Sequence, residues 1–130
     1  MIYTGYWAKV KEYEKHNLVP VGISGWIPDG YNGKTYKKLA PKYVWWKEWH
    51  DGHLSERWYI DKYYETVLKT LDPLVVYQEL QQFGKDVILL CFETPEKFCH
   101  RHLVAQWLNK TNKQNIEEYM LQSKQTQIIL

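Results

Sequence analysis

Short apolar segments alternate along the chain with segments of helical periodicity. Val87 to Cys91 is apolar at every position, which is typical of a strand buried on both faces of a parallel sheet. Ile2 to Trp7 and Leu18 to Ser24 are rich in β-branched and aromatic residues and predict two further strands. Pro20 lacks a backbone N–H donor, so we expect this part of the second strand at a sheet edge or a bulge. Ile116 to Leu121 is interpreted as a last short strand.

Three segments carry the signals of longer helices. Ser55 is a good N-cap for a helix whose apolar stripe follows i, i+3, i+4, i+7, i+8 and i+11. The stripe consists of Ile60, Tyr63, Tyr64, Val67, Leu68 and Leu71. Asp72 and Pro73 supply an N-cap and a proline at the first position of the next helix, which Gly84 ends. A third helix is expected over roughly Cys99 to Asn109. Shorter helical pieces are expected over Ala8 to Lys15, Tyr36 to Leu39 and Val44 to His50.

Strands that alternate with helices predict an α/β fold, here a single-domain three-layer sandwich with a small, mostly parallel sheet. The chain of 130 residues suits one domain, expected over residues 1–121, with a loosely ordered tail over 122–130. In such sheets, ligands bind beyond the carboxyl ends of the strands. This rule selects three segments: Thr4 to Trp7, Ser24 to Asn32, and Cys91 to Arg101.

Composition narrows the class of protein. An apolar fraction of 45% and a charged fraction of 25% exclude a disordered chain, and a net charge of +2 neither requires nor excludes a nucleic-acid partner. The N-terminus lacks a signal-peptide pattern and no apolar run is long enough for a bilayer, so we expect a cytoplasmic protein without membrane association. In that compartment, Cys91 and Cys99 are not expected to form a required disulfide.

The carboxyl end of the central strand carries the first candidate catalytic group. On an extended strand, the side chain of Glu93 would point to the same face as that of Cys91, which is two residues earlier. A carboxylate just beyond an apolar strand needs a cation, hydrogen bonds or solvent. We interpret Glu93 as a general base or nucleophile in a pocket; the alternative is a structural partner of Arg101 or of backbone amides.

Cys99, His100 and Arg101 open the next predicted helix, where free N–H groups and the helix dipole favour anions. Arg101 is the candidate anion clamp because its planar fork suits carboxylate or phosphate. Cys99 is the alternative nucleophile, since the same field favours a thiolate. The alternatives are an ion pair between Arg101 and Glu93, and a packing role for Cys99.

The remaining candidate ligand-binding residues lie in the same three segments: Thr4, Tyr6, Ser24, Trp26, Tyr31, Cys91 and His100. Trp26 and Tyr31 are candidates for stacking on a bound base. The stretch from Gly30 to Trp49 mixes lysines with aromatic residues, a pattern also found in nucleic-acid binding. We favour a packed cap with solvated lysines.

No metal ion or cofactor is assigned. Cys91, Cys99, His100 and His102 contain zinc-ligand types, but their spacing differs from that of usual structural sites. His100 and His102 would also point about 200° apart on a helix. A triad from Ser24 and His100 lacks any mark of a nucleophile elbow, and no phosphate-binding G-x-x-x-x-G-K-[ST] motif is present.

The run Leu89-Leu90-Cys91-Phe92-Glu93 followed by Phe98-Cys99-His100-Arg101 resembles the domain of unknown function 488 family. Weaker similarity lies in Ile2 to Tyr6, Ile23-Ser24 and Tyr36 to Pro41, so that the resemblance covers roughly residues 1 to 109. Family members often have Ser where this chain has Gly5 and Arg where it has Gly25. The resemblance implies a fold and a site rather than a reaction.

Together these features predict a small α/β protein with an anion-accepting pocket at the strand ends. We expect it to bind a nucleotide-like or phosphate-bearing small molecule; processing of that molecule through Glu93 or Cys99 is a hypothesis and not an assigned activity. The main alternative is a non-catalytic binding protein for a nucleotide signal or, less favoured, for nucleic acid. A thiol redox protein using Cys91 and Cys99 is a weaker alternative because the two residues are eight apart rather than in C-x-x-C. The pattern predicts no oligomeric state.

Overall fold

A five-stranded, entirely parallel sheet organises the computed structural model, which describes residues 1–121. The strand order is β3-β2-β4-β1-β5. The strands are β1 (Ile2–Tyr6), β2 (Val19–Gly22), β3 (Lys34–Thr35), β4 (Val87–Cys91) and β5 (Glu117–Glu118). The predicted α/β class is confirmed, and the sheet is wholly rather than mostly parallel.

β4 lies in the middle of the sheet, as its apolar run predicts. All five of its residues are buried, and Val87 is in register with Ile2 of β1 on one side and with Val19 of β2 on the other. Alternate β4 residues enter two different apolar clusters: Leu89 faces one cluster, and Ile88 and Leu90 face the other. Parallel strands buried on both faces need no polar positions, which explains the unbroken apolar run.

Pro20 lies in an interior strand, which corrects the expectation of an edge or a bulge. β2 pairs with β4 along its whole length, whereas its pairing with β3 begins only at Val21. The amides of Val19 and Ile23 donate to carbonyls on the β4 side, so the position between them faces the other way. The missing N–H of Pro20 therefore falls where β3 has not yet begun, and the Tyr31 hydroxyl donates to the Pro20 carbonyl.

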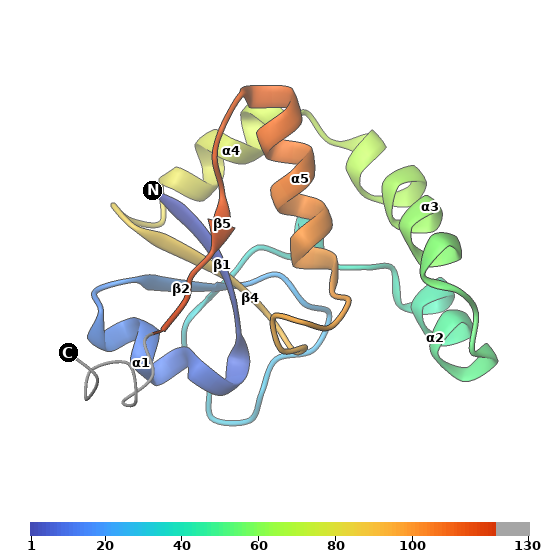
Figure 1. The fold of residues 1–130 in the computed structure, drawn as a ribbon, viewed down its shortest axis with the longest axis horizontal. Helices are drawn as coiled ribbons and strands as arrows, with labels where there is room; N and C mark the ends of the chain where they lie inside the picture. Colours follow the sequence, from blue (N-terminus) through green and yellow to red (C-terminus); the bar gives the residue numbers. More distant parts are fainter. Residues whose placement is uncertain (122–130) are drawn as a thin grey trace, which may run out of the picture.

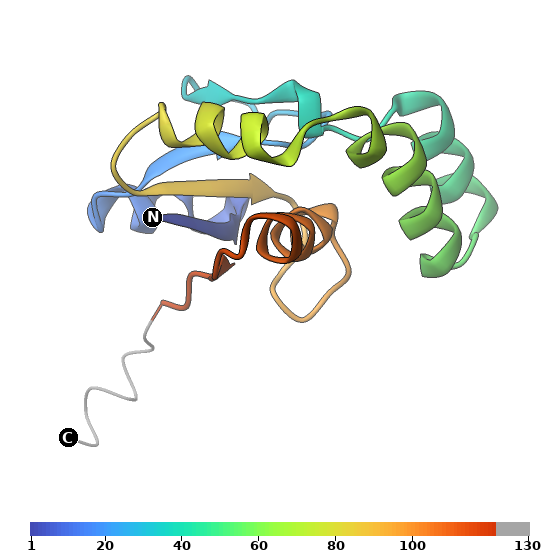
Figure 2. The same cartoon turned by 90° about the horizontal axis from the view of Figure 1, so that it is seen from above.

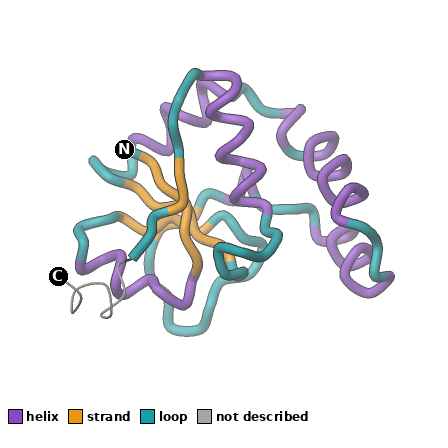
Figure 3. The backbone as a smooth tube through the Cα atoms, in the orientation of Figure 1, coloured by secondary structure: helices purple, strands orange, loops and turns teal. Residues whose placement is uncertain are grey.

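Helices cover both faces of the sheet, which confirms the three layers. The long helices are α2 (Tyr43–Gly52), α3 (Glu56–Thr66), α4 (Pro73–Gln81) and α5 (His100–Asn112). The short ones are α1 (Val10–Lys15), η1 (Trp7–Lys9), η2 (Lys37–Leu39) and η3 (Leu68–Thr70). α4 and α5 pack on the face of Leu89, and Tyr13 of α1 packs on the face of Ile88. The strands occupy the centre with the helices around them (Figure 3).

α2 and α3 form a helical hairpin that extends beyond the sheet (Figures 1 and 2). The Ser55 hydroxyl caps α3 by accepting from the Trp58 amide, and Asp72 caps α4 by accepting from the Leu74 amide. Both predicted caps are thus confirmed.

The long apolar stripe does not form one helix, because α3 ends at Thr66 and the chain turns into η3. The Thr66 hydroxyl donates back to the Lys62 carbonyl, a bond that bends helices. Tyr64, expected in the core, is 54% exposed on α3.

The predicted tail over residues 122–130 lies outside the described residues. Within residues 1–121, we find no helix with the length and apolar character required for a membrane span.

Candidate functional site

A pocket of about 420 Å³ lies at the carboxyl ends of β2 and β4, as the rule for parallel sheets predicts. The α2–α3 hairpin and the N-terminal end of α5 complete its walls. Its aromatic lining residues are Trp26, Tyr43, Trp46, Trp49, Tyr59, Phe92 and Phe98. The polar and sulfur-containing groups come from Ser24, His50, Cys91, Glu93, Cys99 and His100.

Sequence reasoning missed the wall that α2 supplies. Tyr43, Trp46 and His50 follow one another at i, i+3 and i+7, and all three line the pocket. Their rings are stacked, with centroids 6.4 Å apart for Tyr43 and Trp46 and 5.0 Å apart for Trp46 and His50. The spacing was visible in the sequence as one face of a short helix. The direction in which that face points depends on where the hairpin lies.

The lysines of the Gly30 to Trp49 stretch are exposed, and Tyr36, Leu39 and Trp45 are buried, which confirms the packed cap. The same stretch also contributes the α2 wall of the pocket. The cap and the pocket wall are therefore two faces of one segment.

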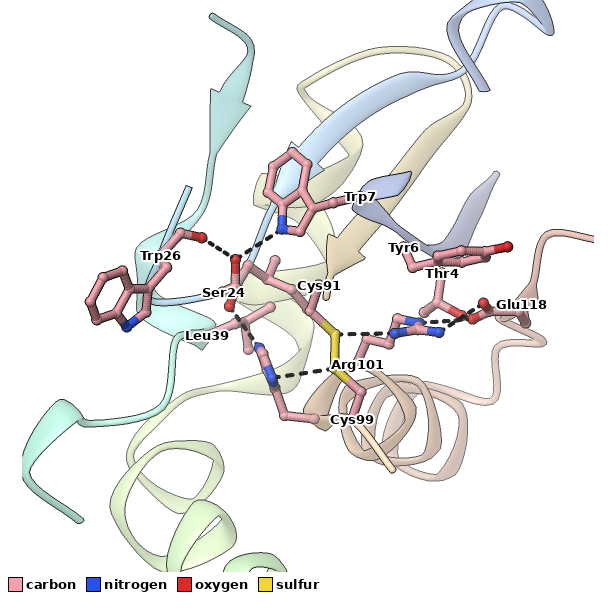
Figure 4. The surroundings of a disulfide bond; sticks show 12 residues. Thr4, Tyr6, Trp7, Ser24, Trp26, Leu39, Cys91, Cys99, Arg101 and Glu118 are labelled. Atoms are coloured by element: carbon pink, nitrogen blue, oxygen red, sulfur yellow. Dashed lines mark hydrogen bonds and ion pairs between the residues drawn. A yellow bond between two sulfur atoms is a disulfide. The ribbon is translucent and has the colours of Figure 1, made fainter. Parts of the chain in front are cut away.

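Ser24 fixes the loop that carries Trp26 at the edge of the pocket. Its hydroxyl accepts from the indole N–H of Trp7 at 3.1 Å and donates to the Trp26 carbonyl (Figure 4). The single O–H donor of this buried hydroxyl and one of its two acceptor lone pairs are therefore used within the protein. Trp26 itself is 61% exposed, so its ring is available to a ligand.

His100 is buried at the floor of the pocket. Its Nε2 lies 2.8 Å from the Ile23 carbonyl, and its Nδ1 lies 4.0 Å from Cys99 Sγ. Burial lowers the pKa of His100 to about 4, and the nearby charge of Arg101 acts in the same direction. Since a carbonyl can only accept, Nε2 carries the proton, and the neutral ring presents the lone pair of Nδ1 to the sulfur.

Cys91 and Cys99 are joined as a disulfide, shown in yellow in Figure 4. The two sulfurs meet because the loop after β4 returns Cys99 to the end of the strand. The expectation that this disulfide is not required for stability stays a prediction. A disulfide sulfur is not a thiolate, so Cys99 can act as a nucleophile only in the reduced protein.

Arg101 does not line the pocket, which corrects its assignment as an anion clamp. Its side chain is fully buried and forms two 3.0 Å bonds to the Glu118 carboxylate, from Nε and Nη2. Nη1 donates to Cys91 Sγ at 3.3 Å. Figure 4 shows the guanidinium extending toward Glu118 and away from Trp26. Arg101 therefore forms an internal ion pair, as the alternative interpretation of the sequence expected, but its partner is Glu118 and not Glu93.

Three other candidate ligand residues also lie outside the pocket lining. The Thr4 hydroxyl donates to Glu118 at 2.7 Å, and the Tyr6 ring lies 6.0 Å from the Arg101 guanidinium carbon. Tyr31 packs edge-on against Trp7, with centroids 4.6 Å apart. Thr4 and Tyr6 thus surround the Arg101 ion pair, and Tyr31 belongs to the opposite face of the sheet.

Glu93 lines the pocket together with Cys91, as the strand geometry predicts. Its side chain is exposed, and within residues 1–121 no hydrogen bond or ion pair engages its carboxylate. Its alternative role as the partner of Arg101 is therefore wrong. A catalytic role for Glu93 remains a prediction.

Comparisons with known proteins agree with the motif that ends β4 and opens α5. A family model described as the active DUF488-N3 subclade matches residues 11–112, which includes both halves of that motif. Neither the curated proteins nor the solved structures gave a match. The matched range spans most of the chain and contains Ser24, Glu93, Cys99 and His100. The chain belongs to the domain of unknown function 488 family, in its active DUF488-N3 subclade.

Proposed function

We propose that the pocket binds a nucleotide-like small molecule and recognises it mainly through its base. The aromatic lining is the observation that carries this proposal. Trp26 and Tyr43 are 61% and 56% exposed at the pocket, although burial is the usual state of such rings. A flat heteroaromatic ring can stack on them, and a volume of about 420 Å³ lies in the ordinary range for small-molecule sites.

The polar groups of the pocket suit the edge of a base. Glu93 offers a carboxylate that has no partner within residues 1–121 and can accept hydrogen bonds from amino and imino groups. Within the described residues, the lining includes no lysine or arginine. Since Arg101 is paired with Glu118, the donors left for a phosphate are the N–H groups at the start of α5 and the ring of His50. We therefore assign a larger share of the binding free energy to the base of the ligand than to its phosphate.

Isothermal titration calorimetry with nucleoside monophosphates tests this proposal, with ribose 5-phosphate as the ligand that lacks a base. Stacking is worth about 1–3 kcal/mol for each base, so Trp26→Ala should weaken binding about 5- to 150-fold. Tyr64→Ala is the matched control, because Tyr64 is similarly exposed and lies outside this pocket. Equal losses in the two variants, or equal affinity for ribose 5-phosphate, would overturn the proposal.

Turnover separates an enzyme from a binding protein at the same site. Glu93 is the group that we propose as the general base, which contributes roughly 10²–10⁴-fold to a rate. Chromatography of each nucleotide after incubation with the protein would reveal a product. A ligand that binds and returns unchanged supports the non-catalytic alternative.

A further inference from the structure

A cluster of two sulfurs and one imidazole lies at the floor of the pocket. The ligand atoms of Cys91, Cys99 and His100 all lie within 4.8 Å of one another, and the three residues are buried. Their spacing along the chain matches no usual metal motif. They meet because the loop after β4 folds back to begin α5 beside the end of the strand.

We propose that the reduced protein binds one zinc-like divalent ion through Cys91 Sγ, Cys99 Sγ and His100 Nδ1. Two thiolates and one imidazole are a ligand set that zinc uses in catalytic sites, where a fourth position remains open. All three residues line the pocket, so the fourth position would face its interior.

The orientation of His100 supports this assignment independently of the sulfurs. The Nε2–H donates to the Ile23 carbonyl at 2.8 Å, which is the kind of outer hydrogen bond that holds metal-ligating histidines. Nδ1 then points at Cys99 Sγ from 4.0 Å, in a residue that is only 5% exposed. In a tetrahedral zinc site, the corresponding nitrogen–sulfur separation is about 3.6 Å, so His100 is already nearly placed.

The sulfurs also have groups that stabilise thiolates. Arg101 Nη1 donates to Cys91 Sγ at 3.3 Å, and Cys99 is the N-cap residue of α5. A cationic donor and the N-terminal end of a helix both favour a negatively charged sulfur. The two sulfurs would move apart to about 3.8 Å around a tetrahedral ion.

The disulfide and the metal site exclude each other. A thiol or phosphine reductant supplies two electrons, and with two protons from solvent the disulfide becomes two thiols. Metal binding then releases the thiol protons, because zinc takes thiolate ligands. The site is thus expected in the reduced chain and absent from the oxidised chain.

Cobalt titration tests the proposal directly, because thiolate-bound Co²⁺ gives charge-transfer absorption in the near ultraviolet. The protein is reduced with tris(2-carboxyethyl)phosphine, desalted without oxygen, and titrated with Co²⁺ and then with Zn²⁺. We expect one equivalent of Co²⁺ with this absorption, and its displacement by Zn²⁺. The oxidised protein should show neither.

Two substitutions on the same helix turn identify the ligands. His100→Gln should weaken Co²⁺ binding at least about 100-fold, since loss of an outer-shell group alone costs 10–100-fold. His102→Gln is the control and should stay within about twofold, because His102 is not part of the cluster.

Should His100→Gln fail to fold, thiol labelling of the unaltered reduced protein replaces it: Zn²⁺ should protect both cysteines from alkylation. Equal Co²⁺ binding by oxidised and reduced protein, equal losses in the two histidine variants, or unprotected thiols would overturn the site. Addition of azide should shift the visible cobalt bands if the fourth position is open. Unchanged bands would overturn the open position.

Discussion

The ion pair between Arg101 and Glu118 is expected to be a major determinant of stability, and Glu118→Gln is the substitution that tests it. Arg101 is fully buried, and the side chain of Glu118 is 14% exposed. Glutamine preserves the shape of the side chain but removes its charge and replaces one acceptor oxygen with an NH₂ group. The guanidinium would then remain buried without a counter-ion.

The size of the effect follows from the bonds that are lost. Hydrogen bonds to charged groups contribute about 1.5–3 kcal/mol each, and Arg101 makes two of them to Glu118. Glutamine can restore only one of them, through its amide oxygen, so at least one bond of about 1.5–3 kcal/mol is lost. Breaking a buried pair from one side costs about 3–5 kcal/mol. We therefore expect a loss of about 3 kcal/mol, or a fall in Tm of roughly 10–15 °C for a domain of this size.

Thermal melting followed by circular dichroism measures the effect. Glu117→Gln is the control at the adjacent, exposed position and should change stability by less than about 0.5 kcal/mol. Replacing both partners, as Arg101→Met with Glu118→Leu, should recover much of the loss, because no charge is then left buried. If Glu118→Gln melts within about 2 °C of Glu117→Gln, the ion pair does not have the assigned role.

Three further outcomes are expected. Glu93→Gln should leave Tm nearly unchanged, because the carboxylate is exposed and makes no hydrogen bond or ion pair within the described residues. Calorimetry should show weaker nucleotide binding by this variant. A large fall in Tm would instead reveal a structural role for Glu93. Burial raises the pKa of Tyr13 to about 12 from 10.0, so its neutral form is favoured by folding. The contribution of Tyr13 to stability should be complete below pH 10 and be lost as the pH rises toward 12. The Tyr13→Phe variant should lose less stability over the same pH range. Urea melts whose midpoints did not move across this range would contradict the expectation. Gly5→Ala should cost about 1–3 kcal/mol, because the added methyl would lie 2.7 Å from Ile88 Cδ1 and 2.8 Å from the Tyr13 ring. Gly25→Ala, whose methyl would find its nearest neighbour at 4.0 Å, should be tolerated, and equal melting of the two variants would refute this distinction.

Four of the five strands were predictable, and β4 could be placed at the centre because an unbroken apolar run is typical of a strand buried on both faces. The short strand β3 (Lys34–Thr35) was not predicted. The caps at Ser55 and Asp72 were predictable because they depend on neighbouring residues. The position of the site followed from the carboxyl-end rule, so Ser24, Trp26, Glu93 and His100 are found there as predicted.

The partner of Arg101 was not predictable by the same reasoning. Glu93 and Arg101 flank one loop, and proximity in the sequence favoured their pairing. The structure instead turns Arg101 to the other side of β4, where β5 runs beside β1 and supplies Glu118. Likewise, the stacked face of α2 was visible as spacing, but only the tertiary placement of the hairpin makes it a pocket wall. Long-range packing decided both cases.

The strand order also has a consequence for the kinetics of folding. β1 and β2 are the first two strands to leave the ribosome, yet they do not pair with each other, because β4 lies between them. Ile2 of β1 and Val19 of β2 both pair with Val87 of β4, so neither pair can form until residue 87 has been synthesised. Contacts between residues so far apart in the sequence slow folding, and unpaired apolar strands favour aggregation in the meantime. A nascent chain that stops before residue 87 should therefore leave β1 without a strand partner and β2 paired only with the two residues of β3. Chaperone demand should fall sharply once β4 has emerged.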